Sequence, residues 1–275
     1  MAKSLACCKN RAVKLGIIGD PVEHSLSPRM HSAALAALGV EGSYELLPTP
    51  VAELGLRIQE VRSGYQGVNV TVPHKRAVME YLDELDNKAA MIGAVNTVVN
   101  RGGRLTGYNT DAPGFYWALE NAGLMPGEAL VLGAGGAARA IVYELVSRGW
   151  LVAVYNRTAD KAQELVEQLG GWLVVGKKID KAVKETPLLI NATSVGLGDP
   201  DASPLSEGVL PESGAVVDIV YEPRKTKLLR DAEAAGLQTL GGLEMLLGQG
   251  VLAFELWTGG PAPVEVMRRA LEEVE

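Results

Sequence analysis

The sequence predicts an α/β fold with two domains, and three observations lead to this prediction. The chain has 275 residues, while a single domain usually holds about 100 to 200. Short apolar segments alternate with segments of helical periodicity, which is typical of βαβ units and a mainly parallel sheet. A glycine-rich turn at Gly133 follows a buried strand and opens a helix, as in a Rossmann-type dinucleotide-binding domain.

Composition and charge exclude several classes of protein. The net charge is −7 and the pI is about 5.2, so neither nucleic acid nor an anionic membrane is expected as the main partner. No segment approaches about 18 uncharged apolar residues, and no signal peptide is expected. The two cysteines, Cys7 and Cys8, are adjacent and offer neither a disulfide framework nor spaced metal ligands. We expect a soluble, cytoplasmic protein without a metal site.

The first half of the chain contains alternating strands and helices. Strands are predicted at 14–19, 43–47, 67–72, 93–100 and 105–108, and helices at 28–38, 51–62, 76–85 and 88–92. Ser27 is a natural N-cap for the helix that begins at Pro28. Capping therefore competes with ligand binding as the explanation of Ser25 and Ser27.

The segment Gly67 to Lys75 reads Gly-Val-Asn-Val-Thr-Val-Pro-His-Lys and places polar side chains near one strand end. Alternation sets Asn69 and Thr71 on the face opposite the valines, and Lys75 follows Pro73 by two residues. Such a cluster could bind a polyhydroxylated ligand. The alternative is an amphipathic edge strand with a solvated Lys75 at the start of a helix.

Two further polar positions have structural and functional interpretations. Asn96 lies among apolar neighbours, so its amide is either a clip between loops or a ligand hydrogen bonder. Thr110 or Asp111 would cap the helix that extends to Gly123, and a domain boundary is expected there.

The second half opens with the strand 129–132, the turn Gly133-Ala134-Gly135-Gly136-Ala137-Ala138 and the helix 139–147. Glycines in this context let backbone N–H groups approach a pyrophosphate at the helix N-terminus. The next strand, 151–155, ends in Asn156-Arg157-Thr158, with Lys161 one turn further on. No acid stands where one would hold the 2′-hydroxyl of NAD, so a guanidinium in that place favours NADP. The alternative for Thr158 is a cap of the helix 159–169.

The remaining elements are the strands 187–191, 215–221 and 237–240 and the helices 225–236, 243–257 and 263–274. The small-residue loop 192–198 is of the kind that lies beneath a nicotinamide. Tyr221 at the end of a strand faces the crevice in which open α/β sheets bind ligands. Gln249 between Gly248 and Gly250 indicates close approach of a helix or a ligand.

Eight motifs together resemble the shikimate dehydrogenase family in order and spacing. They are Ser-Leu-Ser-Pro, Asn-Val-Thr-Val-Pro-His-Lys, Gly-Ala-Val-Asn-Thr, Asn-Thr-Asp, Gly-Ala-Gly-Gly-Ala, Asn-Arg-Thr, Asn-Ala-Thr-Ser and Gly-Gln-Gly, within Gly16 to about Trp257. The resemblance implies reduction of 3-dehydroshikimate to shikimate with NADPH, on the pathway to chorismate and the aromatic amino acids.

The resemblance also assigns roles by motif. Lys75 and Asp111 would form the catalytic pair. Substrate contacts would come from Ser25, Ser27, Asn69, Thr71, Lys75, Asn96, Asp111, Tyr221 and Gln249. Cofactor contacts would come from Gly133, Ala134, Gly135, Gly136, Ala137, Asn156, Arg157, Thr158, Lys161, Thr193, Ile219 and Gly242. Lys161 stands where many members have Arg, and Ile219 replaces a frequent Met.

The expected domains are 1–109 with 242–275 for the substrate and 110–241 for NADP, with the site in the cleft between them. The protein would be a monomer or a homodimer. Two alternatives stay open: a dual quinate/shikimate dehydrogenase, which often prefers NAD, and a non-catalytic sensor of substrate or cofactor. Lys75 and Asp111 together favour the enzyme, because a sensor has no need of a proton donor.

Overall fold

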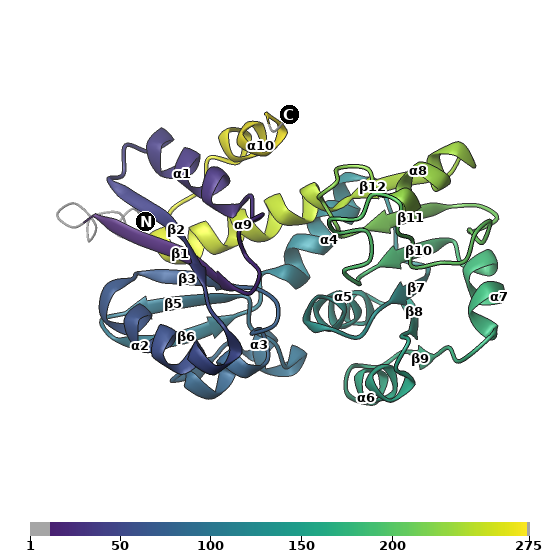
Figure 1. The fold of residues 1–275 in the computed structure, drawn as a ribbon, viewed down its shortest axis with the longest axis horizontal. Helices are drawn as coiled ribbons and strands as arrows, with labels where there is room; N and C mark the ends of the chain where they lie inside the picture. The colour runs from purple at the N-terminus through teal and green to yellow at the C-terminus, as the bar shows by residue number, and fades with distance from the viewer. Residues whose placement is uncertain (1–11, 274–275) are drawn as a thin grey trace. The chain divides into compact units, whose positions relative to one another are not determined.

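The computed structural model describes residues 12–273, which form two compact units (Figure 1). The first unit runs to Thr110 and resumes at Leu246, and the second is Asp111–Met245. Cys7 and Cys8 lie outside the described residues. The functional domain boundaries at 109/110 and 241/242 stay predictions.

The first unit is built on a mixed six-stranded sheet with the order β2-β1-β3-β5-β6-β4. The strands are β1 Val13–Gly19, β2 Gly42–Pro48, β3 Gly67–Val70, β4 Glu84–Leu85, β5 Thr97–Arg101 and β6 Arg104–Tyr108. β1 pairs parallel with both β2 and β3, whereas β5 pairs antiparallel with β3 and β6. β4 pairs parallel with β6, so the sheet has parallel pairs at both edges and antiparallel pairs in the middle, where Gly102 and Gly103 turn the β5–β6 hairpin.

Helices cover both faces of this sheet (Figure 1). They are α1 Ser27–Ala37, the 3₁₀ helix η2 Val51–Glu53, α2 Leu54–Gly64, η3 Ala77–Tyr81, α3 Asn87–Ile92, α9 Gly242–Thr258, most of which lies in this unit, and α10 Val264–Glu272. Val68 and Val70 point into one core together with Ile58 of α2. The intervening Asn69 consequently lies on the opposite face, beside Tyr44.

The second unit is built on an all-parallel sheet with the order β12-β11-β10-β7-β8-β9. Its strands are β7 Glu128–Leu132, β8 Leu151–Tyr155, β9 Trp172–Leu173, β10 Leu188–Asn191, β11 Ala215–Asp218 and β12 Gln238–Gly241. The chain runs outward from β7 to β9 and then returns to β10. β7 and β10 therefore flank the point at which the strand order reverses, where such sheets bind ligands.

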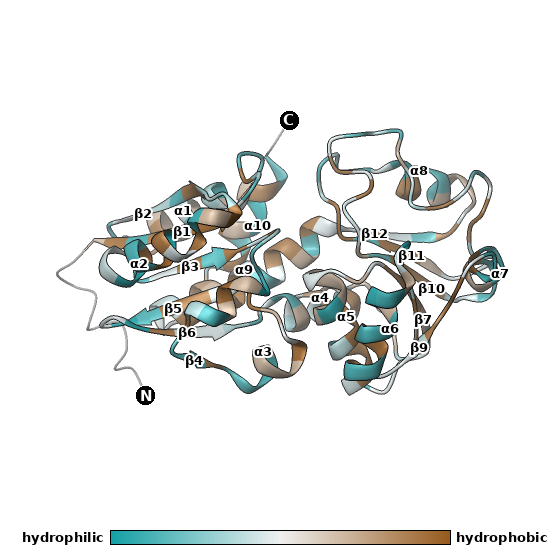
Figure 2. Cartoon of the chain, turned by 60° about the horizontal axis from the view of Figure 1, so that its bottom comes forward, coloured by the Kyte–Doolittle hydropathy of each residue, from teal (hydrophilic) through white to brown (hydrophobic). Residues whose placement is uncertain are grey.

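The helices of this unit are α4 Asp111–Asn121, α5 Gly136–Ser147, α6 Ala159–Leu169, α7 Lys178–Glu185 and α8 Lys227–Ala234. Val131 packs with Ile141 on the face of α4, α5 and α6, while Leu130 packs with Leu228 on the face of α7 and α8. A strand buried on both faces is apolar, as β7 is over residues 129–132, which follow the exposed Glu128. Brown, hydrophobic segments are accordingly seen among the strands of this unit (Figure 2). The predicted fold class, two α/β domains with a Rossmann-type second domain, is confirmed.

Several predicted elements are wrong in detail. The helix predicted over 76–85 is a short 3₁₀ helix, η3, followed by β4, and residues 51–53 are 3₁₀. Asp83 explains the change, because its N–H donates to the carbonyl of Leu105 and its carboxylate accepts from the Leu105 N–H at 2.7 Å. These bonds draw the segment alongside β6. The sequence analysis also missed β9 and α7.

Among residues 12–273, no helix is both long enough and apolar enough to cross a membrane.

Candidate active site

The glycine-rich turn after β7 has the shape that a dinucleotide phosphate requires. Gly133 has φ +116°, and a Cβ there would lie 2.9 Å from the carbonyl oxygen of Ala192. α5 starts at Gly136 after Gly135, and the described first turn carries neither an acidic residue nor a side-chain cap. Backbone N–H groups at that helix end are free to meet an anion, which the helix dipole also favours.

Four of the predicted cofactor residues gather at the carboxyl edge of the second sheet. A Cβ added to Gly133 would lie 3.2 Å from the Cγ2 of Thr193, so the glycine packs closely against this side chain. A Cβ on Gly242 would clash with the backbone of Ile219. The Ala192 N–H donates to the carbonyl of Leu132 at 2.8 Å, so the ends of β7 and β10 are joined at the point where the strand order reverses.

The other predicted cofactor cluster follows β8. The Asn156 amide donates to the carbonyl of Thr158 at 2.8 Å, and Arg157, Thr158 and Lys161 are exposed. Within residues 12–273 neither Arg157 nor Lys161 takes part in an ion pair. Thr158 is the N-cap residue of α6, as the alternative predicts, but its side chain makes no cap hydrogen bond in the described chain, so the hydroxyl does not satisfy a helix N–H. The glycine turn and these unpaired cations fit a phosphorylated dinucleotide.

A buried polar network lies behind the Thr193 loop, and the sequence analysis missed it. Asp218, the last residue of β11, is fully buried and accepts hydrogen bonds from Asn191, Thr226 and the Val220 N–H. Burial raises the pKa of Asp218, and these three donors oppose the shift. No sequence signal links residues 191, 218 and 226, because each lies at the end of a different element.

In the first unit, the side chain of Asn69 makes hydrogen bonds with other residues of the protein. It is 4% exposed, and its Oδ1 accepts from the Tyr44 hydroxyl at 2.6 Å. Its Nδ2 donates to the carbonyl of Asn96 at 3.2 Å and to Thr97 at 3.1 Å. β3 lies between β1 and β5, so the edge-strand alternative for this segment is wrong. The predicted contact between Asn69 and substrate stays a prediction.

Asn96 is a clip between loops, which was one of its two interpretations. Its Oδ1 accepts from the Thr110 N–H at 2.7 Å, and its Nδ2 donates to the Thr110 hydroxyl at 3.0 Å and to Gln249 at 3.4 Å. The Gln249 amide in turn donates to the carbonyl of Leu246 at 2.8 Å. Asn96 and Gln249 are thus brought together. Asp111 follows the clamped Thr110 directly in the chain.

The predicted catalytic residues are placed as follows. Lys75 is half-buried, and its carbonyl accepts from the Val95 N–H at 2.8 Å. Asp111 is the first residue of α4 and is 4% exposed. Thr71 lies just after β3, where its N–H donates to the carbonyl of Ile18 at 2.8 Å. Their contacts with substrate stay predictions.

Ser25 and Ser27 lie at the start of α1. The Ser27 N–H donates to the Ser25 hydroxyl at 3.3 Å, and the N-cap residue is Leu26. The prediction of Ser27 as N-cap is therefore wrong. Tyr221 lies three residues beyond the end of β11, not at its last residue, because the strand stops at Asp218.

His31, a second residue that the sequence analysis missed, lies against this half of the site. It is fully buried, stacks on Tyr44 at 4.6 Å between ring centroids, and contacts Trp257 edge-on at 5.2 Å. Burial lowers the pKa of His31 to about 3, so the imidazole is neutral at physiological pH. Across residues 12–273, no group of three or more His, Cys, Asp or Glu could hold a metal ion.

A parallel sheet with a glycine turn at the point where its strand order reverses, joined to a second α/β unit, defines a Rossmann-type dinucleotide-binding protein. Three family descriptions match: the shikimate dehydrogenase substrate binding domain over residues 17–98, shikimate / quinate 5-dehydrogenase over 118–199, and the shikimate 5′-dehydrogenase C-terminal domain over 242–272. The chain belongs to the shikimate dehydrogenase (NADP⁺) family.

Individual relatives support the same assignment. Shikimate dehydrogenase (NADP⁺) of one Thermus thermophilus strain is 51% identical over 264 residues, which cover 94% of this chain and 99% of the relative. The crystal structure of the enzyme from a second Thermus thermophilus strain, in complex with NADP(H) and shikimate, has a TM-score of 0.89 at 49% identity and covers 94% of this chain and 98% of that one. Quinate dehydrogenase from Corynebacterium glutamicum in complex with NAD has a TM-score of 0.87 at 31% identity, with 96% and 99% covered.

Proposed function

We propose that this chain catalyses the reversible, NADPH-dependent reduction of 3-dehydroshikimate to shikimate, with Lys75 and Asp111 as its acid–base pair. The chain is an NADP-dependent oxidoreductase of the shikimate dehydrogenase family. The strongest support for the proposal is the glycine turn where the strand order of the second sheet reverses, with Gly133 packed against Ala192 and Thr193. It fits the dinucleotide that the crystallised Thermus thermophilus relative binds.

The bound cofactor supplies the hydride. Backbone N–H groups of Gly133 to Ala137 would hold its pyrophosphate, and Arg157 with Lys161 would pair with the 2′-phosphate. A guanidinium forms two parallel hydrogen bonds with a phosphate, whereas an ammonium acts as a point charge. Arg157 therefore determines the preference for NADP over NAD, and Lys161 adds attraction without the planar fork.

Lys75 would act at the oxygen that gains negative charge when the ketone is reduced. A protonated ammonium stabilises that charge and donates the proton, and in the reverse direction the pair accepts the hydroxyl proton. Asp111 would orient the ammonium toward that oxygen.

The function is tested by absorbance at the reduced-nicotinamide band with the purified chain. Shikimate or quinate is offered with either NADP or NAD. We expect NADP to be reduced by shikimate, and the other three pairings to be slower by at least about tenfold. Comparable rates with quinate or NAD would move the chain to the dual-specificity branch that the Corynebacterium glutamicum relative represents. No reduction in any pairing would support the sensor alternative.

The role of Lys75 is tested separately with Lys75→Ala. Loss of one proton donor is expected to lower kcat by about 10² to 10⁴, while shikimate still binds. Lys88→Ala is the matched control, because Lys88 is also a half-buried lysine of the first unit. Full turnover by the Lys75→Ala variant would exclude the assigned role.

The monomeric or homodimeric state and the cytoplasmic location stay predictions.

A further inference from the structure

The buried carboxylate of Asp218 is not used by the proposed chemistry, yet three segments converge on it. Its Oδ1 accepts from Asn191 Nδ2 at 2.9 Å and from the Val220 N–H at 3.0 Å. Its Oδ2 accepts from the Thr226 hydroxyl at 2.7 Å. Asn191, Asp218 and Thr226 each have 0% of their surface exposed. Both oxygens are occupied by donors from the protein, so the carboxylate stays an acceptor and is not itself a ligand group.

The first segment is the loop after β10. Asn191 links Asp218 to this loop, because its Oδ1 accepts from the Thr193 N–H at 3.1 Å and from the Thr193 hydroxyl at 2.7 Å. The Thr193 hydroxyl accepts in turn from the Val195 N–H at 3.1 Å. The position and rotamer of Thr193, which packs against Gly133, are thereby set from Asp218.

The second segment is the loop after β11, and the third is the start of α8. The bond from Val220 fixes the backbone next to Ile219, against which Gly242 packs. Thr226 is the N-cap of α8, since its side chain accepts from the Leu229 N–H at 3.4 Å. The two loops are also joined directly, because the Gly198 N–H donates to the carbonyl of Glu222 at 3.4 Å.

We propose that Asp218 is a positioning residue for cofactor binding, which holds Thr193 and Ile219 ready at the carboxyl edge of the second sheet before the dinucleotide arrives. This inference rests on the proposed function for the identity of the ligand. Ordering these loops in advance removes an entropy cost from binding. Burying a carboxylate opposes folding, and a role in positioning these loops accounts for its presence at the end of β11.

The experiment compares Asp218→Ala with Asp218→Asn in the full chain. Asparagine keeps an oxygen for Asn191 and Val220 and can donate to Thr226, whereas alanine removes all three acceptor contacts. Amide hydrogen exchange of Thr193 and Val220 is measured without cofactor, and the dissociation constant of NADP⁺ is measured by calorimetry without substrate. For Asp218→Ala we expect exchange at both amides to be about tenfold faster and the dissociation constant to be about tenfold higher. Asp218→Asn is expected to stay within about threefold of the wild type in both.

Thr186→Val is the matched control in the same unit. Thr186 is 7% exposed and its hydroxyl donates to the carbonyl of Leu188 at 3.0 Å, beside the opposite end of β10. We expect it to lower thermal stability while leaving the Thr193 and Val220 amides and NADP⁺ binding unchanged. An equal loss of NADP⁺ binding in this control would overturn the positioning role, and so would wild-type behaviour of Asp218→Ala or full loss in Asp218→Asn.

Asn191→Ala serves if Asp218→Ala does not fold. It detaches Thr193 while Val220 and Thr226 stay bound to Asp218, so only the Thr193 amide is expected to exchange faster, again with weaker NADP⁺ binding. Unchanged exchange at Thr193 would overturn the proposal. The exchange readout needs no ligand; a wild-type chain that does not bind NADP⁺ would therefore reject the proposed function separately.

Discussion

At the scale of single residues, His31 shows how the core beneath the substrate half constrains chemistry. Both of its ring nitrogens are buried without a hydrogen-bond partner among the described residues, and its faces contact Tyr44 and Phe254. A charged imidazole there would lose its hydration, and this burial outweighs the opposing interaction with the Asn69 side chain, which is why the pKa falls from 6.5 to about 3. Tyr44 donates to Asn69, so His31 supports the residue that β3 presents.

This pKa predicts an acid-dependent loss of stability. Below pH 6.5 the unfolded chain protonates His31 while the folded chain does not, so the free energy of unfolding decreases as the pH falls from 6.5 toward 3. The full effect is on the order of 5 kcal/mol. His31→Phe keeps an aromatic ring in the stack but cannot be protonated. Its free energy of unfolding, relative to that of the wild type, should therefore rise steadily as the pH falls over that range. Denaturant unfolding at several pH values measures this difference.

His24→Gln provides the control, because His24 is exposed. It should follow the wild type at every pH. A constant difference between His31→Phe and the wild type from about pH 7 to about pH 4 would contradict the assignment.

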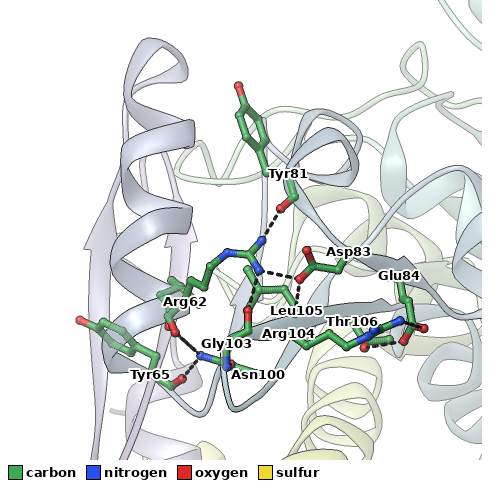
Figure 3. Close-up of polar contacts among 11 residues, drawn as sticks. Arg62, Tyr65, Tyr81, Asp83, Glu84, Asn100, Gly103, Arg104, Leu105 and Thr106 are labelled. Carbon is green, nitrogen blue, oxygen red and sulfur yellow. Dashed lines mark hydrogen bonds and ion pairs between the residues drawn. The ribbon is translucent and has the colours of Figure 1, made fainter.

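At the scale of elements, the C-terminal end of α2 is fastened to the β5–β6 hairpin by Asn100 and Arg62 (Figure 3). The Asn100 amide donates to the carbonyls of Val61, Arg62 and Tyr65 at 3.0, 2.9 and 2.8 Å, and its oxygen accepts from the Gly103 N–H at 2.8 Å. Arg62 pairs with Asp83 at 2.6 Å, and its guanidinium lowers the pKa of that carboxyl. A helix end, a turn and β4 are thus joined around two side chains.

Replacing Asn100 with alanine removes four hydrogen bonds, three of which are donated to carbonyls at the C-terminal end of α2. We expect Asn100→Ala to lower the free energy of unfolding by about 1 to 3 kcal/mol. Urea denaturation followed by tryptophan fluorescence measures the change. Asn87→Ala, at the exposed start of α3, is the control and should shift the midpoint little. Equal midpoints for the two variants would show that the Asn100 bonds contribute nothing net.

At the scale of the whole molecule, each unit has its own sheet and its own buried clusters. The residues proposed for the dinucleotide lie in the second unit, and most of those proposed for the substrate lie in the first. A ligand stabilises the structure that binds it, by about 2.7 kcal/mol at a concentration about one hundred times its dissociation constant.

We therefore expect the two ligands to protect different parts of the chain from hydrogen exchange. NADP⁺ should protect peptides covering 133–138, 156–161 and 192–198, and shikimate should protect those covering 69–75 and 96. Mass spectrometry of exchanged peptides measures this. Arg157→Ala should weaken the protection by NADP⁺ and leave that by NAD unchanged. Protection by NADP⁺ confined to the first unit would contradict the placement of the cofactor.

The fold could be predicted from the sequence where its signals are local. A strand, a glycine turn and a helix follow one another within a few residues at Gly133, so pattern alone locates them. The helix predicted over 76–85 was wrong because Val78, Leu82 and Leu85 have helical spacing, while the bonds between Asp83 and Leu105 that overrule it come from 22 residues away. The fold likewise brings together Tyr44 and Asn69, and Asp218 and Thr226. No spacing along the sequence predicts these contacts.

Gly67 of β3 lies so close to the indole of Trp257 in α9 that a methyl group would not fit between them, and the indole N–H donates to the carbonyl of Val98 at 2.9 Å. The first unit is thus completed by a helix made after the whole second unit. On a ribosome that adds roughly 5 to 20 residues per second, the strands of this sheet are synthesised on the order of ten seconds before that helix. During this interval the side of the sheet that carries Asn69 is covered by α1 but not yet by α9, so the nascent first unit exposes surface that the complete chain buries, while the second unit is made without interruption.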